Sequence, residues 1–166
     1  MNDLFLECYD QYFNDVYRYV LHKTSNKWDT EELVSEIFRK AFEKFESARG
    51  YENKKPWLMV IAKNTVIDYY RTKGRVYVTE NMEPYIEPYS FVEELEKGDE
   101  IGCLKKSLQQ LPEEDVEIIG LRYFSEMKFK EISETLEKPE GTIRVKSTRI
   151  MKKLAILISN CLEGIS

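Results

Sequence analysis

The segment 128–154 constrains the fold of this chain most, because it carries two helical apolar patterns separated by a proline. Apolar side chains recur at three- and four-residue spacing over 129–136, which predicts a short helix. Pro139 interrupts the pattern, since proline has no backbone N–H and fits a loop or the first turn of a helix. A second pattern begins at about Glu140. The segment therefore predicts two helices joined by a tight turn, which is the helix-turn-helix arrangement.

The second of these helices combines an apolar face with a separate ridge of one hydroxyl and three cations. At 100° per residue the four side chains fall within roughly 60° of arc. They are Thr142, Lys146, Arg149 and Lys153. In helix-turn-helix proteins the second helix enters the major groove of DNA, and such a ridge suits that use. A solvated basic surface explains the ridge as well, so the pattern alone leaves both interpretations open.

Composition limits the fold class and the number of domains. The chain has 166 residues, of which 42% are hydrophobic and 13% aromatic, enough for one medium domain or two small ones. With only 7 Gly and 5 Pro, an all-β or disordered chain is disfavoured. No apolar run approaches the roughly 20 residues that span a membrane. The N-terminus carries acids where a signal peptide needs cations, so we expect a cytosolic protein.

Cysteine and histidine are too sparse to predict a covalent link or a metal site. Cys8, Cys103 and Cys161 are odd in number and far apart, which fits neither a disulfide framework nor a metal-ligand cluster. His22 is the single histidine, so a two-histidine metal site is excluded. The carboxylates of segment 29–45 lack the Glu-x-x-His pattern of di-iron bundles. We therefore expect no metal, no cofactor and no catalytic residue.

The net charge of −5 is unevenly distributed along the chain. Residues 1–75 hold 13 basic and 12 acidic residues, and residues 104–166 hold 11 and 10, so each part has a net charge of +1. Residues 76–103 hold one basic and eight acidic residues, a net charge of −7, and predict an extended linker. Two nearly neutral ends supply few phosphate contacts, so we expect DNA binding to depend on a larger assembly.

The first 75 residues predict three helices. Segment 3–24 places aromatic side chains at helical spacing, which predicts a helix whose aromatic stripe lies in a core. Asp29 with Glu32 resembles a capping box, so a second helix is expected to begin at Asp29. The charged side of this helix suits a protein partner or solvent. Pro56 suits the first position of a third helix, after a polar loop over 46–55.

The third helix ends in a basic tail that contains Arg71, Lys73 and Arg75. Aromatic side chains beside cations are typical of surfaces that hold unstacked single-stranded bases. A core helix with a solvated basic end accounts for the same residues, and the residues alone favour that interpretation. In the C-terminal part, helices over 103–111 and 115–124 are expected to pack on the helix-turn-helix as a four-helix unit.

Two separated segments resemble one family. DTEELVSEIFRKAF at 29–42, followed by PWLMVIAKNTVIDYYR at 56–71, is similar to region 2 of bacterial sigma-70 family sigma factors of the extracytoplasmic-function group. LQQLPEEDVEIIGLRYFSEMKFKEISETLEKPEGTIRVKSTRIMKKL at 108–154 is similar to their region 4. The resemblance implies two small helical domains, 1–75 and 104–166, joined by the acidic linker 76–103. It also implies a non-enzymatic subunit that directs RNA polymerase to promoters.

The resemblance implies three sets of binding residues. The positions for core polymerase are Asp29, Glu32, Ser35, Glu36 and Arg39. The positions for the minus-ten element are Tyr51, Lys54, Lys55, Trp57, Lys63, Asn64, Asp68 and Arg71. The positions for the minus-thirty-five element are Thr142, Arg144, Lys146, Arg149 and Lys153. The acidic linker is expected to lie in the basic RNA-exit path of the polymerase.

The implied partners are RNA polymerase core enzyme, promoter DNA and a membrane-associated anti-sigma factor that holds the chain at the membrane, with no stable homo-oligomer. The sequence departs from the family pattern at the turn, where Glu137 replaces a glycine, Lys138 an apolar residue and Pro139 a serine cap. Ser35 and Ser147 replace a usual Gln and Leu. A stand-alone helix-turn-helix regulator is the main alternative, and an all-helical metal enzyme is a third.

Overall fold

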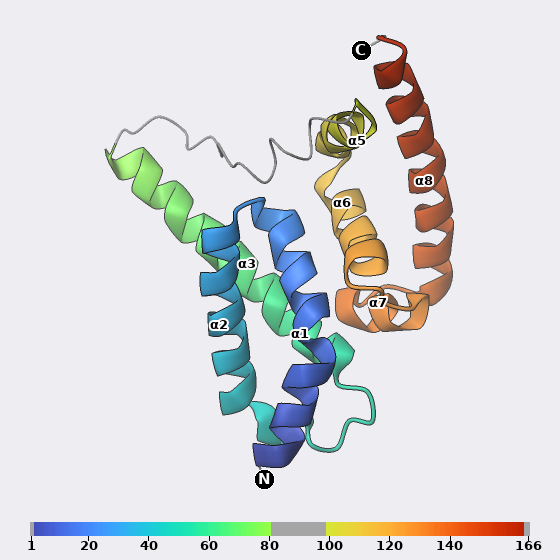
Figure 1. Cartoon of the computed structure of the whole chain (residues 1–166). Helices are drawn as coiled ribbons and strands as arrows, with labels where there is room; N and C mark the ends of the chain where they lie inside the picture. Colours follow the sequence, from blue (N-terminus) through green and yellow to red (C-terminus); the bar gives the residue numbers. More distant parts are fainter. Residues whose placement is uncertain (1, 81–98, 165–166) are drawn as a thin grey trace. The chain divides into compact units, whose positions relative to one another are not determined.

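The structure is a computed structural model that describes residues 2–80 and 99–164 (Figure 1). All the elements in these two ranges are helical, which confirms the predicted all-α class. The chain divides into two compact units, 1–87 and 88–166. We call their described parts the N-terminal lobe, 2–80, and the C-terminal lobe, 99–164. No helix within these ranges is long and apolar enough to cross a membrane.

The N-terminal lobe consists of three long helices and one short 3-10 turn. The elements are α1 (Asn2–Thr24), α2 (Lys27–Glu43), η1 (Phe45–Ala48) and α3 (Lys55–Glu80). Each helix contacts the other two, so that one shared core forms among them. Fully buried side chains from all three helices fill it, among them Val16, Tyr19, Ile37, Leu58 and Met59.

The start of α2 differs from the prediction. The helix begins at Lys27, not at Asp29, and its N-cap is Asn26, whose side-chain oxygen accepts a hydrogen bond from the Asp29 N–H at 3.0 Å. Asparagine is among the best N-cap residues because its short side chain reaches the unpaired N–H groups of the first turn. Ser25 has a φ of 55°, which turns the chain sharply between α1 and α2.

The two helices that flank the predicted linker are longer than expected. Helix α3 continues to Glu80, and α5 begins at Asp99, so both ends of the predicted 76–103 linker are helical. The remainder of that linker lies outside the described residues. The apolar positions of α3 are not restricted to one face, which is why their period gives no clear end point.

The C-terminal lobe is the expected four-helix unit. Its elements are α5 (Asp99–Gln109), α6 (Glu113–Ile119), a π turn η2 (Gly120–Phe124), α7 (Phe129–Leu136) and α8 (Glu140–Leu162). The bounds of α7 and the start of α8 agree with the prediction. The predicted 115–124 helix begins earlier and changes to a π turn at Gly120. The core holds Ile118, Leu121, Met127, Ile132 and Ile143, all fully buried.

The prediction that the cysteines form no disulfide is wrong. Cys103 on α5 and Cys161 on α8 are joined, with 5.7 Å between their Cα atoms. They are 58 residues apart in the sequence, and only the packing of α5 against α8 brings them together. Sequence spacing carries no information about such a contact, and the odd number of cysteines argued against a disulfide. Cys8 is the cysteine left over, and it is free and buried in the N-terminal lobe.

Candidate protein and nucleic-acid interfaces

Helix α2 presents a face of mixed charge to solvent. Glu32, Ser35 and Arg39 are exposed, whereas Asp29 and Glu36 are half-buried. Arg39 donates to Glu36 at 2.8 Å and to Glu43 at 2.6 Å, one turn away in each direction. Its hydrogen bond holds the pKa of the Glu36 carboxyl below the ordinary value, and the pair raises the pKa of Arg39. Two of the predicted polymerase positions, Glu36 and Arg39, are thus joined by an ion pair within a charged surface.

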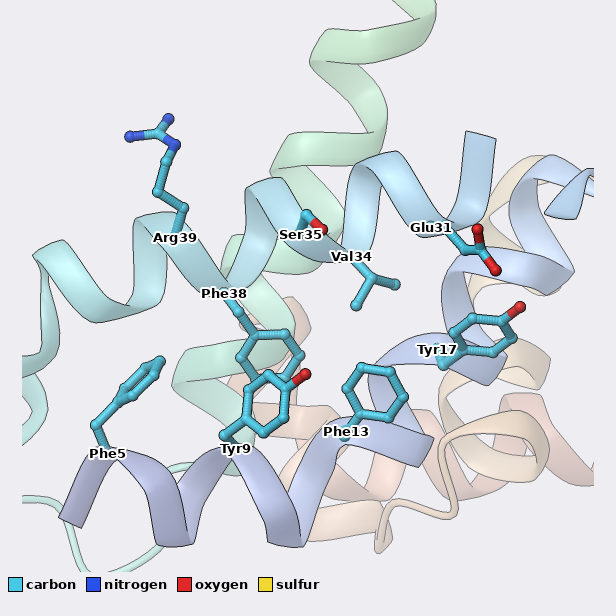
Figure 2. Close-up of a pocket in the computed structure, with 9 residues that line it drawn as sticks. All are labelled: Phe5, Tyr9, Phe13, Tyr17, Glu31, Val34, Ser35, Phe38 and Arg39. Atoms are coloured by element: carbon cyan, nitrogen blue, oxygen red, sulfur yellow. The ribbon is translucent and has the colours of Figure 1, made fainter. Parts of the chain in front are cut away.

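An aromatic groove lies beside this face, between α1 and α2. Figure 2 shows the rings of Phe5, Tyr9 and Phe13 projecting from α1 toward Phe38, while the guanidinium of Arg39 extends away from them. The ring centroids of Tyr9 and Phe38 are 4.7 Å apart. The groove has a volume of about 480 Å³. The residues lining it are Phe5, Tyr9, Phe13, Tyr17, Glu31, Val34, Ser35, Phe38 and Arg39.

The groove refines the predicted aromatic stripe of α1. Tyr19 is fully buried, but the rings nearer the N-terminus are only half-buried and line an open surface. Helical periodicity identifies the side of a helix that is apolar, but not whether a neighbouring helix covers that side completely. The sequence reasoning therefore missed Tyr9 and Phe13 as surface residues next to Ser35.

A second surface includes the loop before α3 and the outer side of that helix. Tyr51 is exposed, and Lys54 donates to its backbone carbonyl at 2.9 Å. On α3, Asn64, Asp68 and Arg71 are exposed and follow one another at helical spacing. Lys63 is half-buried. The Arg71 guanidinium lies 3.5 Å from the Asp68 carboxylate.

Two of the residues predicted for this surface serve the lobe itself. The ammonium of Lys55 lies 2.9 Å from the carboxylate of Asp15 on α1, and the two side chains are only 8% and 16% exposed. Trp57 is half-buried and packs edge-on against Phe45, with ring centroids 6.2 Å apart. Lys55 is therefore an internal ion-pair residue in this lobe, and its charge is not presented to a ligand.

The basic ridge of α8 is largely open to solvent. Thr142, Arg149 and Lys153 are exposed and Lys146 is half-buried. Three of these residues line an open depression at the start of α8, and Pro139 of the preceding turn lines it as well. It is lined by Pro139, Gly141, Thr142, Val145, Lys146 and Arg149. Within the described ranges, Arg149 and Lys153 form no ion pair, so their charges are available to a partner.

Arg144 lies on another side of α8, although it belongs to the predicted set. Its guanidinium pairs with Glu140 at 2.9 Å and stacks on the ring of Phe129 from α7, 4.8 Å from the centroid. Arg122 stacks on the same ring at 4.0 Å. Cation–π stacking on one ring thus links η2, α7 and α8. Phe129 was predicted only as an apolar helix position, and sequence spacing gives no signal that its ring also stacks with two arginines.

Glu114 on α6 is a further residue that sequence reasoning missed. Its two carboxylate oxygens lie 2.6 Å from the Lys146 ammonium and 3.0 Å from that of Lys138. The hydrogen bond from Lys146, and then that from Lys138, lowers the pKa of Glu114 below its ordinary value. A single carboxylate therefore contacts both the turn and the recognition helix of the helix-turn-helix.

The turn between α7 and α8 accommodates a residue where glycine is usual. Glu137 has φ 57° and ψ 47°, the left-handed conformation that favours glycine. The N–H of Lys138 donates to the Ser133 carbonyl at 3.1 Å, which closes the turn. Pro139 then caps α8 with its fixed φ of −59°.

Comparison with known proteins agrees with this geometry. The Sigma-70 region 2 family matches residues 8–76, and the Sigma-70 region 4 family matches residues 101–154. The ECF RNA polymerase sigma factor SigM of Bacillus subtilis is 28% identical over 152 residues, which cover 91% of this chain and 93% of SigM. The chain belongs to the extracytoplasmic-function group of sigma-70 factors. SigV of the same organism is 28% identical over 160 residues, which cover 94% of this chain and 92% of SigV.

Solved sigma factors share the fold. A Bartonella quintana RpoE, crystallised with the anti-sigma factor NepR, matches with a TM-score of 0.72 and 22% identity, over 96% of this chain and 98% of that one. CnrH, in complex with the cytosolic domain of CnrY, matches with a TM-score of 0.70 and 16% identity, over 96% of this chain and 90% of CnrH. This sigma factor is a promoter-specificity subunit and not an enzyme. A stand-alone regulator is not favoured, since regions 2 and 4 both match.

Proposed function

We propose that this sigma factor divides promoter recognition between its two lobes while it is bound to core RNA polymerase. The domain over 1–75 binds the polymerase and captures the opened minus-ten element. The domain over 104–166 reads the minus-thirty-five element as duplex, and the acidic segment 76–103 follows the basic RNA-exit path. The observation that carries the proposal is the open basic ridge of α8 within the region 4 match, with Arg149 and Lys153 unpaired among the described residues.

The face of α2 is the proposed contact with core polymerase. Glu32, Ser35 and Arg39 are exposed there, and Asp29 and Glu36 extend the same charged surface. Ion pairs within the helix orient the Arg39 guanidinium toward Glu36 and Glu43. The adjoining aromatic groove supports the proposal, because its rings from α1 are only half-buried and aromatic side chains are enriched at protein interfaces.

The loop before α3 and the outer side of α3 are the proposed minus-ten surface. The exposed ring of Tyr51 and the neighbouring Lys54 supply an aromatic and a cation, the combination that holds unstacked bases. Exposed polar groups along α3 then continue this surface. The proposed set is Tyr51, Lys54, Trp57, Lys63, Asn64, Asp68 and Arg71. We omit Lys55, because its ammonium is buried against Asp15.

The ridge of Thr142, Lys146, Arg149 and Lys153 is the proposed minus-thirty-five surface. Arg and Lys suit the guanine edges of the major groove and the phosphates beside it. Arg144 is the least suited member of the predicted set, since its guanidinium stacks on Phe129. Its exposed position still permits a phosphate contact at the edge of the groove.

We also propose that an anti-sigma factor restrains this protein in the cytoplasm, at the membrane. Two solved sigma factors of the same fold are in complexes with such inhibitors, and the CnrY part in one of them is a cytosolic domain. The aromatic groove between α1 and α2 is the binding surface we assign to this inhibitor, in competition with the polymerase.

Run-off transcription with purified core polymerase tests the proposal. We expect promoter-specific transcripts only when this protein is added to core enzyme. Arg149→Ala is expected to lower minus-thirty-five-dependent initiation about tenfold, as one lost base or phosphate contact predicts, while core binding in a pull-down is unchanged. Lys152→Ala removes a charge from the same helix outside the ridge and serves as the control. Equal loss of core binding by Arg149→Ala would mean that the ridge is structural.

A further inference from the structure

The disulfide of the C-terminal lobe joins two ends of the DNA-binding unit. Cys103 lies in the second turn of α5, and Cys161 lies in the last turn of α8. Helix α8 is continuous, so the bond is attached to the same rigid element that carries Thr142 to Lys153. The bond closes a loop of 58 residues that contains α6, α7 and most of α8.

The two cysteine residues differ in their exposure to solvent. Cys103 is 7% exposed, whereas Cys161 is half-buried, so we take Cys161 as the residue that meets an oxidant first. A sigma factor acts beside RNA polymerase, in a compartment that keeps thiols reduced, and disulfides in such compartments are mostly transient, catalytic or regulatory. We propose that Cys103 and Cys161 form a reversible oxidation site whose closure stabilises the DNA-binding lobe.

The chemistry requires an oxidant of the peroxide class. The Cys161 thiolate attacks a peroxide oxygen, the O–O bond breaks, and Cys161 becomes a sulfenic acid while the leaving oxygen takes a proton as water or an alcohol. The Cys103 thiolate then attacks the Cys161 sulfur and expels hydroxide, which leaves as water. Two thiols and one hydrogen peroxide thus give one disulfide and two waters. A dithiol reductant reverses the step by thiol–disulfide exchange.

Closure is expected to act through the unfolded state. Linking two residues that far apart in the sequence restricts the unfolded chain, and the effect grows with loop length. The reduced lobe keeps the same apolar core around Ile118 and Ile143, so it still folds, but with a lower Tm. An oxidant would therefore preserve the duplex-reading helix under conditions that weaken protein folds. The chemistry is independent of the proposed function, whereas its consequence for transcription rests on it.

Thiol counting on the full chain tests the chemistry. The reduced protein is treated with hydrogen peroxide, quenched and denatured, and its thiols are alkylated and weighed by mass spectrometry. We expect the wild-type count to fall from three to one, because Cys8 belongs to the other lobe and stays free. Cys8→Ser is the matched control and should fall from two to none. Sulfinic or sulfonic products in place of the disulfide would overturn the proposal.

Stability and reversibility are measured on the same samples. We expect the oxidised C-terminal lobe to unfold roughly 10 °C or more above the reduced one, with no such difference in Cys161→Ser. Cys161→Ser is chosen because the residue is partly exposed, and its reduced-state Tm should match that of reduced wild type. A bond that excess reduced glutathione fails to open is a permanent structural link, and that result would overturn the switch.

A transcription arm separates this inference from the proposed function. The oxidised chain, freed of peroxide, is added to core polymerase, and run-off is measured at increasing temperature. We expect oxidised wild type to retain activity at temperatures where the reduced chain and Cys161→Ser lose it. If both redox forms direct initiation with identical temperature profiles, the switch is wrong while the sigma-factor assignment stands.

Discussion

Glu114 on α6 accepts a hydrogen bond from Lys146 on α8 at 2.6 Å. Its second oxygen pairs with Lys138, which lies in the turn before α8. Lys146 belongs to the ridge proposed to face DNA. The Glu114 carboxylate therefore pairs with an ammonium group that a DNA phosphate could otherwise contact. An exposed ion pair of this kind is worth little in water, so a DNA phosphate can displace Glu114. On the proposed function, we therefore expect Glu114 to compete with the DNA backbone for Lys146.

Glu114→Gln is expected to strengthen duplex binding. The substitution removes a negative charge and releases both lysines, so one or two additional phosphate contacts become available. Each contact makes the slope of log K against log salt steeper by about 0.9. We expect severalfold tighter binding of a minus-thirty-five duplex by the holoenzyme at low salt, and a slope steeper by roughly one to two. Titrations across a salt series measure both quantities.

Glu113→Gln is the matched control for that experiment. Glu113 lies beside Glu114 in the first turn of α6 and is exposed. Its substitution therefore changes the net charge by the same amount without releasing a lysine. We expect its effect on the salt slope to be close to zero. Weaker binding by Glu114→Gln would show that the carboxylate positions the two lysines and does not compete with DNA.

The pair between Glu114 and the lysines also predicts a pH dependence of stability. Hydrogen bonds from Lys146 and Lys138 depress the pKa of the folded-state carboxyl below its ordinary value of 4.5. A depressed pKa contributes stability that is present above the unfolded-state value and is lost as the pH falls through the folded-state value. Thermal unfolding of wild type and Glu114→Gln should therefore differ by a constant amount near neutral pH. The difference should disappear only below about pH 4.5.

The ion pair between Lys55 and Asp15 predicts a loss of stability and not of base recognition. Both side chains are mostly buried, and Lys55→Met leaves the carboxylate of Asp15 with Arg18, 2.7 Å away, as its remaining cation. Removing one partner of a buried pair costs about 3–5 kcal/mol when the other charge is left uncompensated, so the contact of Asp15 with Arg18 makes the expected loss smaller than this. Urea unfolding of the N-terminal lobe measures this loss, and exposed Lys27→Met is the control. The double variant Lys55→Met with Asp15→Asn should recover part of it, whereas a Lys55→Met protein of normal stability would contradict the assignment.

Much of the fold could be predicted because the helices obey simple periods. The apolar spacing of α7 gave both of its ends, and Pro139 marked the start of α8. The aperiodic end of α3 and the cap at Asn26 were mispredicted, since several nearby residues could serve as a boundary or cap.

The sites could be predicted less completely, because side chains from different helices meet there. The ridge on α8 follows from one helix and its period. The contacts of Glu114 with Lys146, of Lys55 with Asp15 and of Cys103 with Cys161 each join two elements distant in sequence. No local pattern specifies those contacts, and only the tertiary packing of the helices creates them.

The turn before α8 gives the last prediction, which concerns Glu137. Its left-handed backbone costs a residue with a side chain about 1–2 kcal/mol, a cost that glycine does not have. Glycine loses about 0.4–1 kcal/mol of this gain through the greater freedom of the unfolded chain. Glu137→Gly should therefore stabilise the C-terminal lobe by about 0.5–1 kcal/mol, measured by urea unfolding.

Glu137→Ala separates the backbone effect from the loss of a charge. Alanine removes the carboxylate but keeps the Cβ atom, so the left-handed strain remains and no gain is expected. The turn is closed by the bond from the Lys138 N–H to the Ser133 carbonyl, which neither variant removes. If Glu137→Ala stabilises the lobe as much as Glu137→Gly, then the carboxylate beside the helix end, and not the positive φ, is the unfavourable feature at this turn.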